Sequence, residues 1–109
     1  MDNLFTDLPA AVPDEIFTTL MSQGGVRIER IVSDGQATPA GRWYDQDDWE
    51  WVLLLEGEAG LRFEDEAADR ALRRGDYLPI APHRRHRVTF TAPRTVWLAV
   101  WWPAEPLPS

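Results

Sequence analysis

Apolar and polar residues alternate with a period of two in several short stretches after residue 25. The first stretch covers residues 26–32. A second, residues 49–55, is almost wholly apolar with Glu50 as the one charge within it. A period of two is that of a strand, whose successive side chains face opposite sides of a sheet. Further short strands, separated by Gly, Pro and Asp turns, are predicted at residues 59–63, 71–72, 77–80, 87–90 and 96–102. This spacing favours a closed or sandwiched antiparallel sheet.

The chain before residue 26 carries a different pattern. Residues 1–12 are irregular, and the segment Pro13-Asp14-Glu15 then precedes four apolar residues at helical spacing, Ile16, Phe17, Leu20 and Met21. Acidic residues at the start and two glycines at the end favour a short amphipathic helix. We therefore expect one domain in three parts: an N-terminal arm and short helix (1–25), a β-barrel (26–103) and a Pro-rich tail (104–109).

Composition narrows the class of protein. The 109 residues are 44% hydrophobic and include six Trp, two Tyr and four Phe, which is enough for one modest core. A net charge of −7 argues against nucleic acid and anionic membranes as partners, because both need a cationic surface. The absence of cysteine excludes disulfides, thiolate nucleophiles and zinc fingers. An acidic N-terminal segment and the lack of a long apolar run predict a cytoplasmic protein.

Two segments concentrate the side chains that can support chemistry. Residues 75–86 place both histidines of the chain, His83 and His86, beside a predicted tight turn. Residues 43–57 run from acidic and amide side chains into the apolar strand that contains Glu50. Any site built on imidazole therefore lies at the first of these segments, and the question is whether the second converges on it.

As a pair, the two segments resemble the two motifs of the cupin superfamily. The first motif is matched at its two glycines and its glutamate by Gly41, Gly57 and Glu50. The second is matched by Gly75, Asp76, Pro82 and His86. The intervening stretch of 17 residues, 58–74, is similar to that of compact single-domain bacterial cupins, the cupin_2-like or RmlC-like barrels. The resemblance implies an all-β fold, a double-stranded β-helix or jelly-roll barrel, to which the short N-terminal helix would be added.

The same resemblance implies a divalent metal ion held by three histidines and a glutamate. This chain has two histidines in total, and the places of the first-motif histidines fall within residues 43–46. The resemblance therefore implies a reduced set of ligands: His86, Glu50 and an oxygen of Asp45 or Gln46, with His83 as a further candidate. Such a set, with open coordination positions, suits Mn, Fe, Ni or Zn.

The proposed ligands also have plainer interpretations. His83 fits a turn residue that bonds to the backbone or to one of the nearby carboxylates, which is the commoner role for a histidine in such a place. Glu50 would equally be explained by burial beside an arginine such as Arg42 or Arg87. The acidic residues that follow Tyr44 would also fit a solvated loop.

The aromatic residues divide into two groups. We expect Trp43, Tyr44 and Trp51 to line the mouth of the pocket. The last strand instead carries candidates for the core and for the subunit interface of a homodimer, namely Trp97, Trp101 and Trp102.

Three functions are compatible with these residues. The first is a small cupin that binds a divalent metal in its pocket and acts on a small organic molecule by chemistry of the oxygenase or isomerase type. The second is a metal-free cupin that binds or senses a small molecule without catalysis. The third is a structural dimer with a vestigial pocket.

Overall fold

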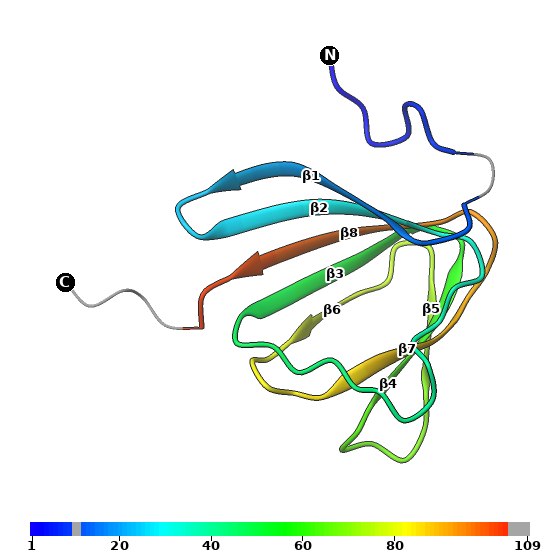
Figure 1. The fold of residues 1–109 in the computed structure, drawn as a ribbon, viewed down its shortest axis with the longest axis vertical. Coiled ribbons are helices and arrows are strands. Elements are labelled where there is room, and N and C mark those ends of the chain that lie inside the picture. The colour runs from blue at the N-terminus through cyan, green and yellow to red at the C-terminus, as the bar shows by residue number, and fades with distance from the viewer. Residues whose placement is uncertain (10–11, 105–109) are drawn as a thin grey trace.

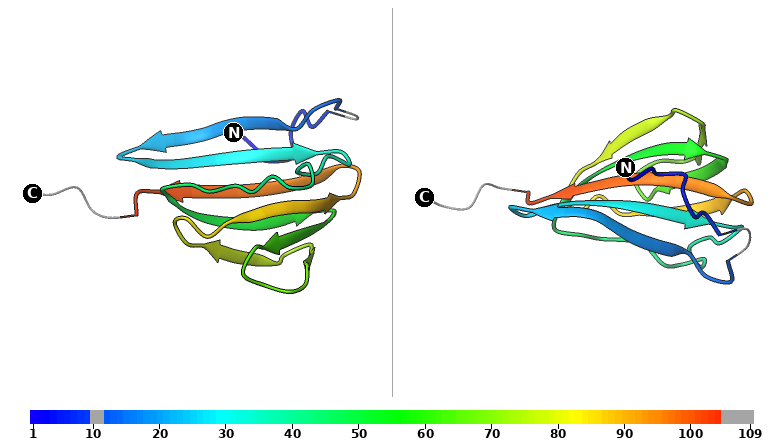
Figure 2. Two further views of the ribbon diagram at one scale, coloured as in Figure 1. Left: turned by 60° about the horizontal axis from the view of Figure 1, so that its bottom comes forward. Right: turned by 90° about the horizontal axis from the view of Figure 1, so that it is seen from above.

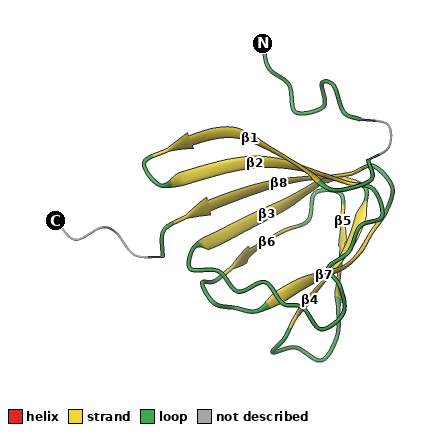
Figure 3. Cartoon of the chain, viewed as in Figure 1, coloured by secondary structure: helices red, strands yellow, loops and turns green. Residues whose placement is uncertain are grey.

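The computed structural model describes residues 1–9 and 12–104, and within them the protein is built from strands and loops (Figures 1 and 3). No described segment is helical, so none is a helix that could cross a membrane. The eight strands are β1 (Ile16–Gln23), β2 (Val26–Ser33), β3 (Trp49–Glu56), β4 (Glu58–Phe63), β5 (Arg70–Arg73), β6 (Tyr77–Ile80), β7 (His86–Thr91) and β8 (Thr95–Trp102). The strands predicted from residue 26 onward are confirmed, with ends that differ by one residue at most.

The strands form two antiparallel sheets. The larger has the order β1-β2-β8-β3-β6 and the smaller has the order β5-β4-β7. The smaller sheet lies beside β3 and β6, while the β1–β2 hairpin forms the opposite edge of the molecule (Figures 1 and 2). Because sequential strands switch between the two sheets, the chain winds as a jelly roll and the predicted all-β cupin architecture is confirmed.

Alternation along β3 decides what faces the space between the sheets. Glu50, Val52 and Leu54 are buried, whereas the residues between them are only partly covered. The register carries this inner face across the larger sheet, so that one row of opposed residues consists of Arg27, Trp101, Glu50 and Ile80. Apolar residues of the smaller sheet close the core from the other side, namely Leu61, Phe63 and Leu72.

The predicted N-terminal helix is wrong. Residues 16–23 form β1, which pairs antiparallel with β2 through a turn in which Gly24 and Gly25 both have positive φ. Two glycines between apolar runs are a strong hairpin signal, because the tight primed turns need positive φ at both central residues. The spacing that suggested a helix arises from a bulge at Leu20, where the register shifts between Thr19 and Met21. The last part of the predicted Pro-rich tail, residues 105–109, lies outside the described residues.

Candidate functional site

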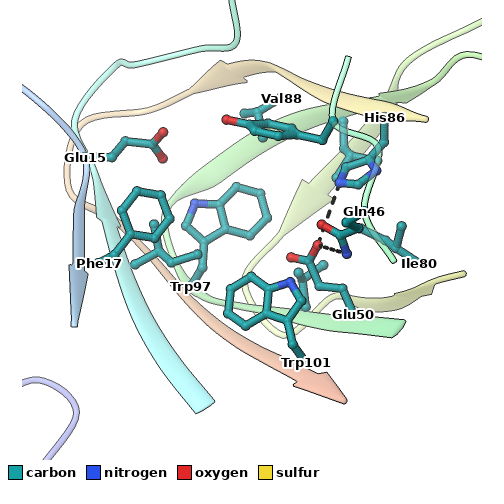
Figure 4. Close-up of a pocket in the computed structure, with 13 residues that line it drawn as sticks. Glu15, Phe17, Gln46, Glu50, Ile80, His86, Val88, Trp97 and Trp101 are labelled. Atoms are coloured by element: carbon teal, nitrogen blue, oxygen red, sulfur yellow. Dashed lines mark hydrogen bonds and ion pairs between the residues drawn. The ribbon is translucent and has the colours of Figure 1, made fainter. Parts of the chain in front are cut away.

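A cavity of about 130 Å³ lies between the two sheets (Figure 4). Its walls are mainly apolar, and the polar side chains among its lining residues are Glu15, Tyr44, Gln46, Glu50 and His86. Phe17 and Tyr44 are 57% and 48% exposed, whereas Glu50 and His86 are 7% and 4% exposed. The mouth therefore lies near the two aromatic residues, and the buried end holds the carboxyl and imidazole groups.

Three polar side chains meet at the buried end. The Oε1 atom of Glu50 lies 3.7 Å from Nε2 of His86 and accepts a hydrogen bond of 3.1 Å from Nε2 of Gln46. Glu50 comes from β3 and His86 from the first residue of β7. Tyr44 exchanges two backbone hydrogen bonds with His86, at 2.7 and 3.2 Å, and this pairing holds the loop that carries Gln46 against the site. Both cupin-like segments thus converge on one cavity.

The orientation of the His86 ring leaves one nitrogen for the cavity. Its Nδ1 lies 2.8 Å from the carbonyl oxygen of Arg84, so Nδ1 carries the hydrogen and donates it there. Burial lowers the pKa of His86, because desolvation disfavours the charged ring. In the neutral ring, Nε2 then presents a free lone pair toward Glu50, which is the form in which histidine accepts a proton or binds a metal.

The pKa of Glu50 is higher than that of an ordinary surface glutamate. Burial raises its pKa from 4.5 to about 7, and hydrogen bonds from Gln46 and Trp101 offset only part of that effect. No arginine of the described chain forms an ion pair with it, and Arg87 instead lies over the ring of Trp43 at 5.4 Å. A carboxyl group that titrates near neutrality inside a cavity is typical of functional sites.

His83 and Asp45 lie on the surface and do not reach the cavity. The His83 side chain is 63% exposed, with Nδ1 at 2.7 Å from Asp45 and Nε2 at 3.2 Å from Asp47. The hydrogen bond to Asp45 raises the pKa of His83. Its φ of 61° is the left-handed conformation that glycine favours, which agrees with its place at the bend glycine of the motif. Geometry thus supports the turn-residue interpretation of His83 and brings neither residue to the cavity where Glu50 and His86 meet.

The predicted pocket aromatics need a correction. Tyr44 lines the cavity, but Trp43 and Trp51 do not. Trp51 follows Glu50 on a regular strand and therefore faces the opposite side of the sheet, where its ring packs 5.6 Å from that of Tyr77.

Several residues line the cavity although the sequence pattern does not place them there. Trp97 and Trp101 lie in the core, as expected, and they also form part of the cavity wall. They lie four residues apart on β8 and therefore share one face of the strand. The spacing in the sequence alone indicates this. The helical spacing assigns Phe17 to a helix that begins near Glu15, whereas the structure places both residues in the lining of the cavity. Glu15 is held by a 2.6 Å hydrogen bond from the Ser33 hydroxyl, a contact that no sequence pattern indicated.

The donors available to a metal are few. In the described part of the chain, no three side chains of His, Asp or Glu come close enough together to hold an ion. The groups that do meet are the Nε2 of His86, the carboxylate of Glu50 and the side-chain amide of Gln46.

Comparison with solved structures places this geometry in a family. A protein from Ralstonia eutropha JMP134, described as a "putative mannose-6-phosphate isomerase", is 48% identical over 95% of this chain and 98% of its own, with a TM-score of 0.92. A cupin superfamily protein from Desulfitobacterium hafniense DCB-2 has a TM-score of 0.73 at 21% identity, covering 88% of this chain and 84% of its own. The chain belongs to the cupin superfamily. An RmlC-like cupin from Desulfovibrio desulfuricans shares this cupin's fold with a TM-score of 0.76 at 17% identity, covering 94% and 95%.

Comparisons by sequence find no match for this cupin, unlike the comparison with solved structures. No family model matches it, and no curated protein does either. The family is therefore identified through three-dimensional structure together with the 48% identity to the Ralstonia eutropha protein.

Proposed function

We propose that this cupin binds a small organic molecule in the cavity between its sheets. The observation that carries the proposal is a mainly apolar cavity with one buried polar end, formed by Glu50, His86 and Gln46. Apolar walls provide the burial that holds a ligand, and a few placed polar groups fix its orientation. A cavity of about 150 Å³ in another protein holds benzene, so the 130 Å³ here suits a ligand of about six non-hydrogen atoms.

The polar end can also move a proton. Glu50, with its pKa near 7, is able to donate a proton at neutral pH, and the neutral ring of His86 is able to accept one at Nε2. The two atoms are 3.7 Å apart, so one oxygen or nitrogen of a ligand can contact both. A proton-transferring reaction, such as an isomerisation, is the activity that this pair supports.

The cavity of this chain lacks the groups that would bind the sugar phosphate in the name of the Ralstonia eutropha neighbour. Proteins bind phosphate mainly with arginine, lysine and backbone N–H groups. None of the described residues that line the cavity is an arginine, and the chain contains no lysine.

A divalent metal is the second candidate occupant of the polar end. The specific observation in its favour is a buried carboxylate without an arginine partner, placed beside the free Nε2 of His86. With its amide turned over, Gln46 would present an oxygen as the third donor, and this mixed set fits a weak site with open positions. When bound, such an ion would act as a Lewis acid. His86 and Glu50 would orient the ligand in either case.

The indole N–H signals of the six tryptophans provide a direct test of ligand binding. We expect small apolar alcohols to shift the NMR signals of Trp97 and Trp101 in EDTA-treated protein and to leave Trp51, on the opposite face of the sheet, unchanged. A Val88→Phe variant, which fills the cavity from β7, should abolish the shifts. The absence of any ligand-dependent shift at Trp97 or Trp101 would contradict the proposal.

The metal candidate has its own measurement. Elemental analysis of tag-free protein should find near-stoichiometric metal that is lost in a His86→Ala variant if the second candidate is correct. Trace metal that is the same in both proteins, before and after reconstitution, would exclude that candidate and leave the small-molecule proposal standing.

A further inference from the structure

The charges that line the cavity all have one sign. Glu50 lies at the buried end and Glu15 at the other side of the cavity, beside Phe17 (Figure 4). No arginine is present among the described lining residues, and the only basic group among them is the ring of His86, whose Nδ1–H donates to the carbonyl oxygen of Arg84. An anionic ligand would therefore meet carboxylates without a compensating cation. A cationic ligand would instead supply the positively charged partner that Glu50 lacks.

The aromatic lining favours the same ligand charge. Four aromatic side chains contribute to the cavity, namely Phe17, Tyr44, Trp97 and Trp101. The face of an aromatic ring carries negative potential and attracts ammonium groups, most strongly when water is excluded. The side chains that provide the apolar wall are thus also suited to surround a cation.

The arginine whose charge acts on Glu50 is engaged with other groups. Arg27 lies 4.5 Å from the ring centroid of Trp101 and pairs with Glu29 at 3.3 Å. Its charge lowers the pKa of Glu50 less than the hydrogen bonds from Gln46 and Trp101 do. Among the arginines of the described chain, Arg27 is the one whose charge acts on Glu50, and it serves as a test of the alternative.

We infer that the cavity is selective for a small organic cation, a compact apolar body that carries an ammonium group. The inference rests on the proposed function, since it names the class of molecule that the same cavity takes. The ammonium group donates hydrogen bonds to Glu50 at the buried end, and the apolar body packs against Val52, Ile80 and Trp97.

Three probes of six non-hydrogen atoms each test the charge preference: cyclopentylamine, cyclopentanol and cyclopropanecarboxylate. Each is titrated into EDTA-treated protein while the indole signals of Trp97 and Trp101 are followed. We expect the ammonium probe to bind about tenfold more tightly than the alcohol, a difference of about 1.4 kcal/mol, and the carboxylate to cause no shift.

Two substitutions separate local charge from the overall net charge of −7. Glu50→Gln should reduce the preference for the ammonium probe over the alcohol to about twofold. Glu56→Gln removes the same charge from an exposed position that pairs with Arg74 outside the cavity, and it should leave the preference unchanged. Equal losses in both variants would show that only bulk charge is at work and would overturn the inference.

The remaining outcomes are also decisive. Alcohol binding as tight as ammonium binding would overturn the inference but keep the proposed function. The same holds if the carboxylate binds most tightly and Arg27→Gln abolishes that binding. If none of the three probes shifts either indole signal, both the inference and the proposed function fail.

Discussion

Glu50 shows how one position alters the chemistry of a side chain. The residue lies in an apolar strand, faces the cavity and has two hydrogen-bond donors but no arginine partner. Its protonated form is therefore favoured in the folded protein relative to the unfolded chain. Since pKa differences between the two states are differences in stability, this group makes the free energy of unfolding depend on pH.

The sign of this dependence follows from the raised pKa. Between the unfolded value of 4.5 and the folded value of about 7, the folded protein holds a proton that the unfolded chain has released. Stability is therefore complete below pH 4.5 with respect to this group and falls as the pH rises toward 7. The loss amounts to about 3 kcal/mol. A glutamine at this position cannot titrate and should remove the loss.

We therefore predict that Glu50→Gln stabilises the protein at about pH 8 by up to about 3 kcal/mol and has little effect at about pH 5. Urea unfolding of both proteins at the two pH values measures the difference. A Glu56→Gln variant, altered at an exposed ion pair, is the control and should show no comparable dependence on pH. A stability difference between wild type and Glu50→Gln that is the same at both pH values would contradict the assigned pKa.

At the scale of elements, the turns after β3 and β5 use glycine for different reasons. Gly57 and Gly75 have φ values of 92° and 90°, in the region that only glycine adopts without strain. A Cβ atom at Gly57 would also collide with Thr95, since it would meet Oγ1 and approach Cα to 2.8 Å. At Gly75 nothing lies within 4 Å of the added atom. The two motif glycines thus differ in whether β8 packs against them.

This difference predicts unequal costs for the same substitution. Gly75→Ala should lower the free energy of unfolding by about 1–2 kcal/mol, because it introduces only backbone strain. Gly57→Ala should lower it by about 3 kcal/mol or more, because the β3–β4 turn must also move away from Thr95. Chemical denaturation of the two variants compares them directly. Equal costs would mean that the close approach of Thr95 to the turn contributes nothing.

At the scale of the whole molecule, the location of exposed apolar surface bears on assembly. The last strand, β8, lies between β2 and β3, so both of its edges are paired within the chain. Exposed apolar side chains instead gather on β1, an edge strand without a charged residue, and they are Ile16, Phe17, Leu20 and Met21. Edge strands of this kind invite pairing with another chain.

We predict a homodimer that forms through β1. Sedimentation velocity should show a dimer for the wild type and a monomer for Met21→Lys, because a charge on the edge opposes strand pairing. The control is Phe90→Lys, which alters a residue of similar exposure on β7, and it should remain dimeric. A monomeric wild type, or dissociation caused by Phe90→Lys alone, would contradict the prediction.

Much of the fold and part of the site could be predicted from local pattern. Alternation located the strands from β2 to β8, because the period of side-chain burial is a property of the strand itself. Motif spacing brought His86 and Glu50 together, and the same alternation should have excluded Trp51 from the cavity. The sequence by itself therefore determined the class of fold, the turns and the two central residues of the site.

The tertiary structure decided what local pattern leaves open. Residues 16–23 became a strand because β2 offered a partner for their backbone groups, and a bulge disguised the period. His83 turned to Asp45 and Asp47, whose loop is distant in sequence. Trp97, Trp101 and Glu15 became cavity residues, and Glu50 acquired its raised pKa, through packing between the two sheets. Alternation fixes which residues share a face, but burial, partners and charge depend on what the rest of the chain places over that face.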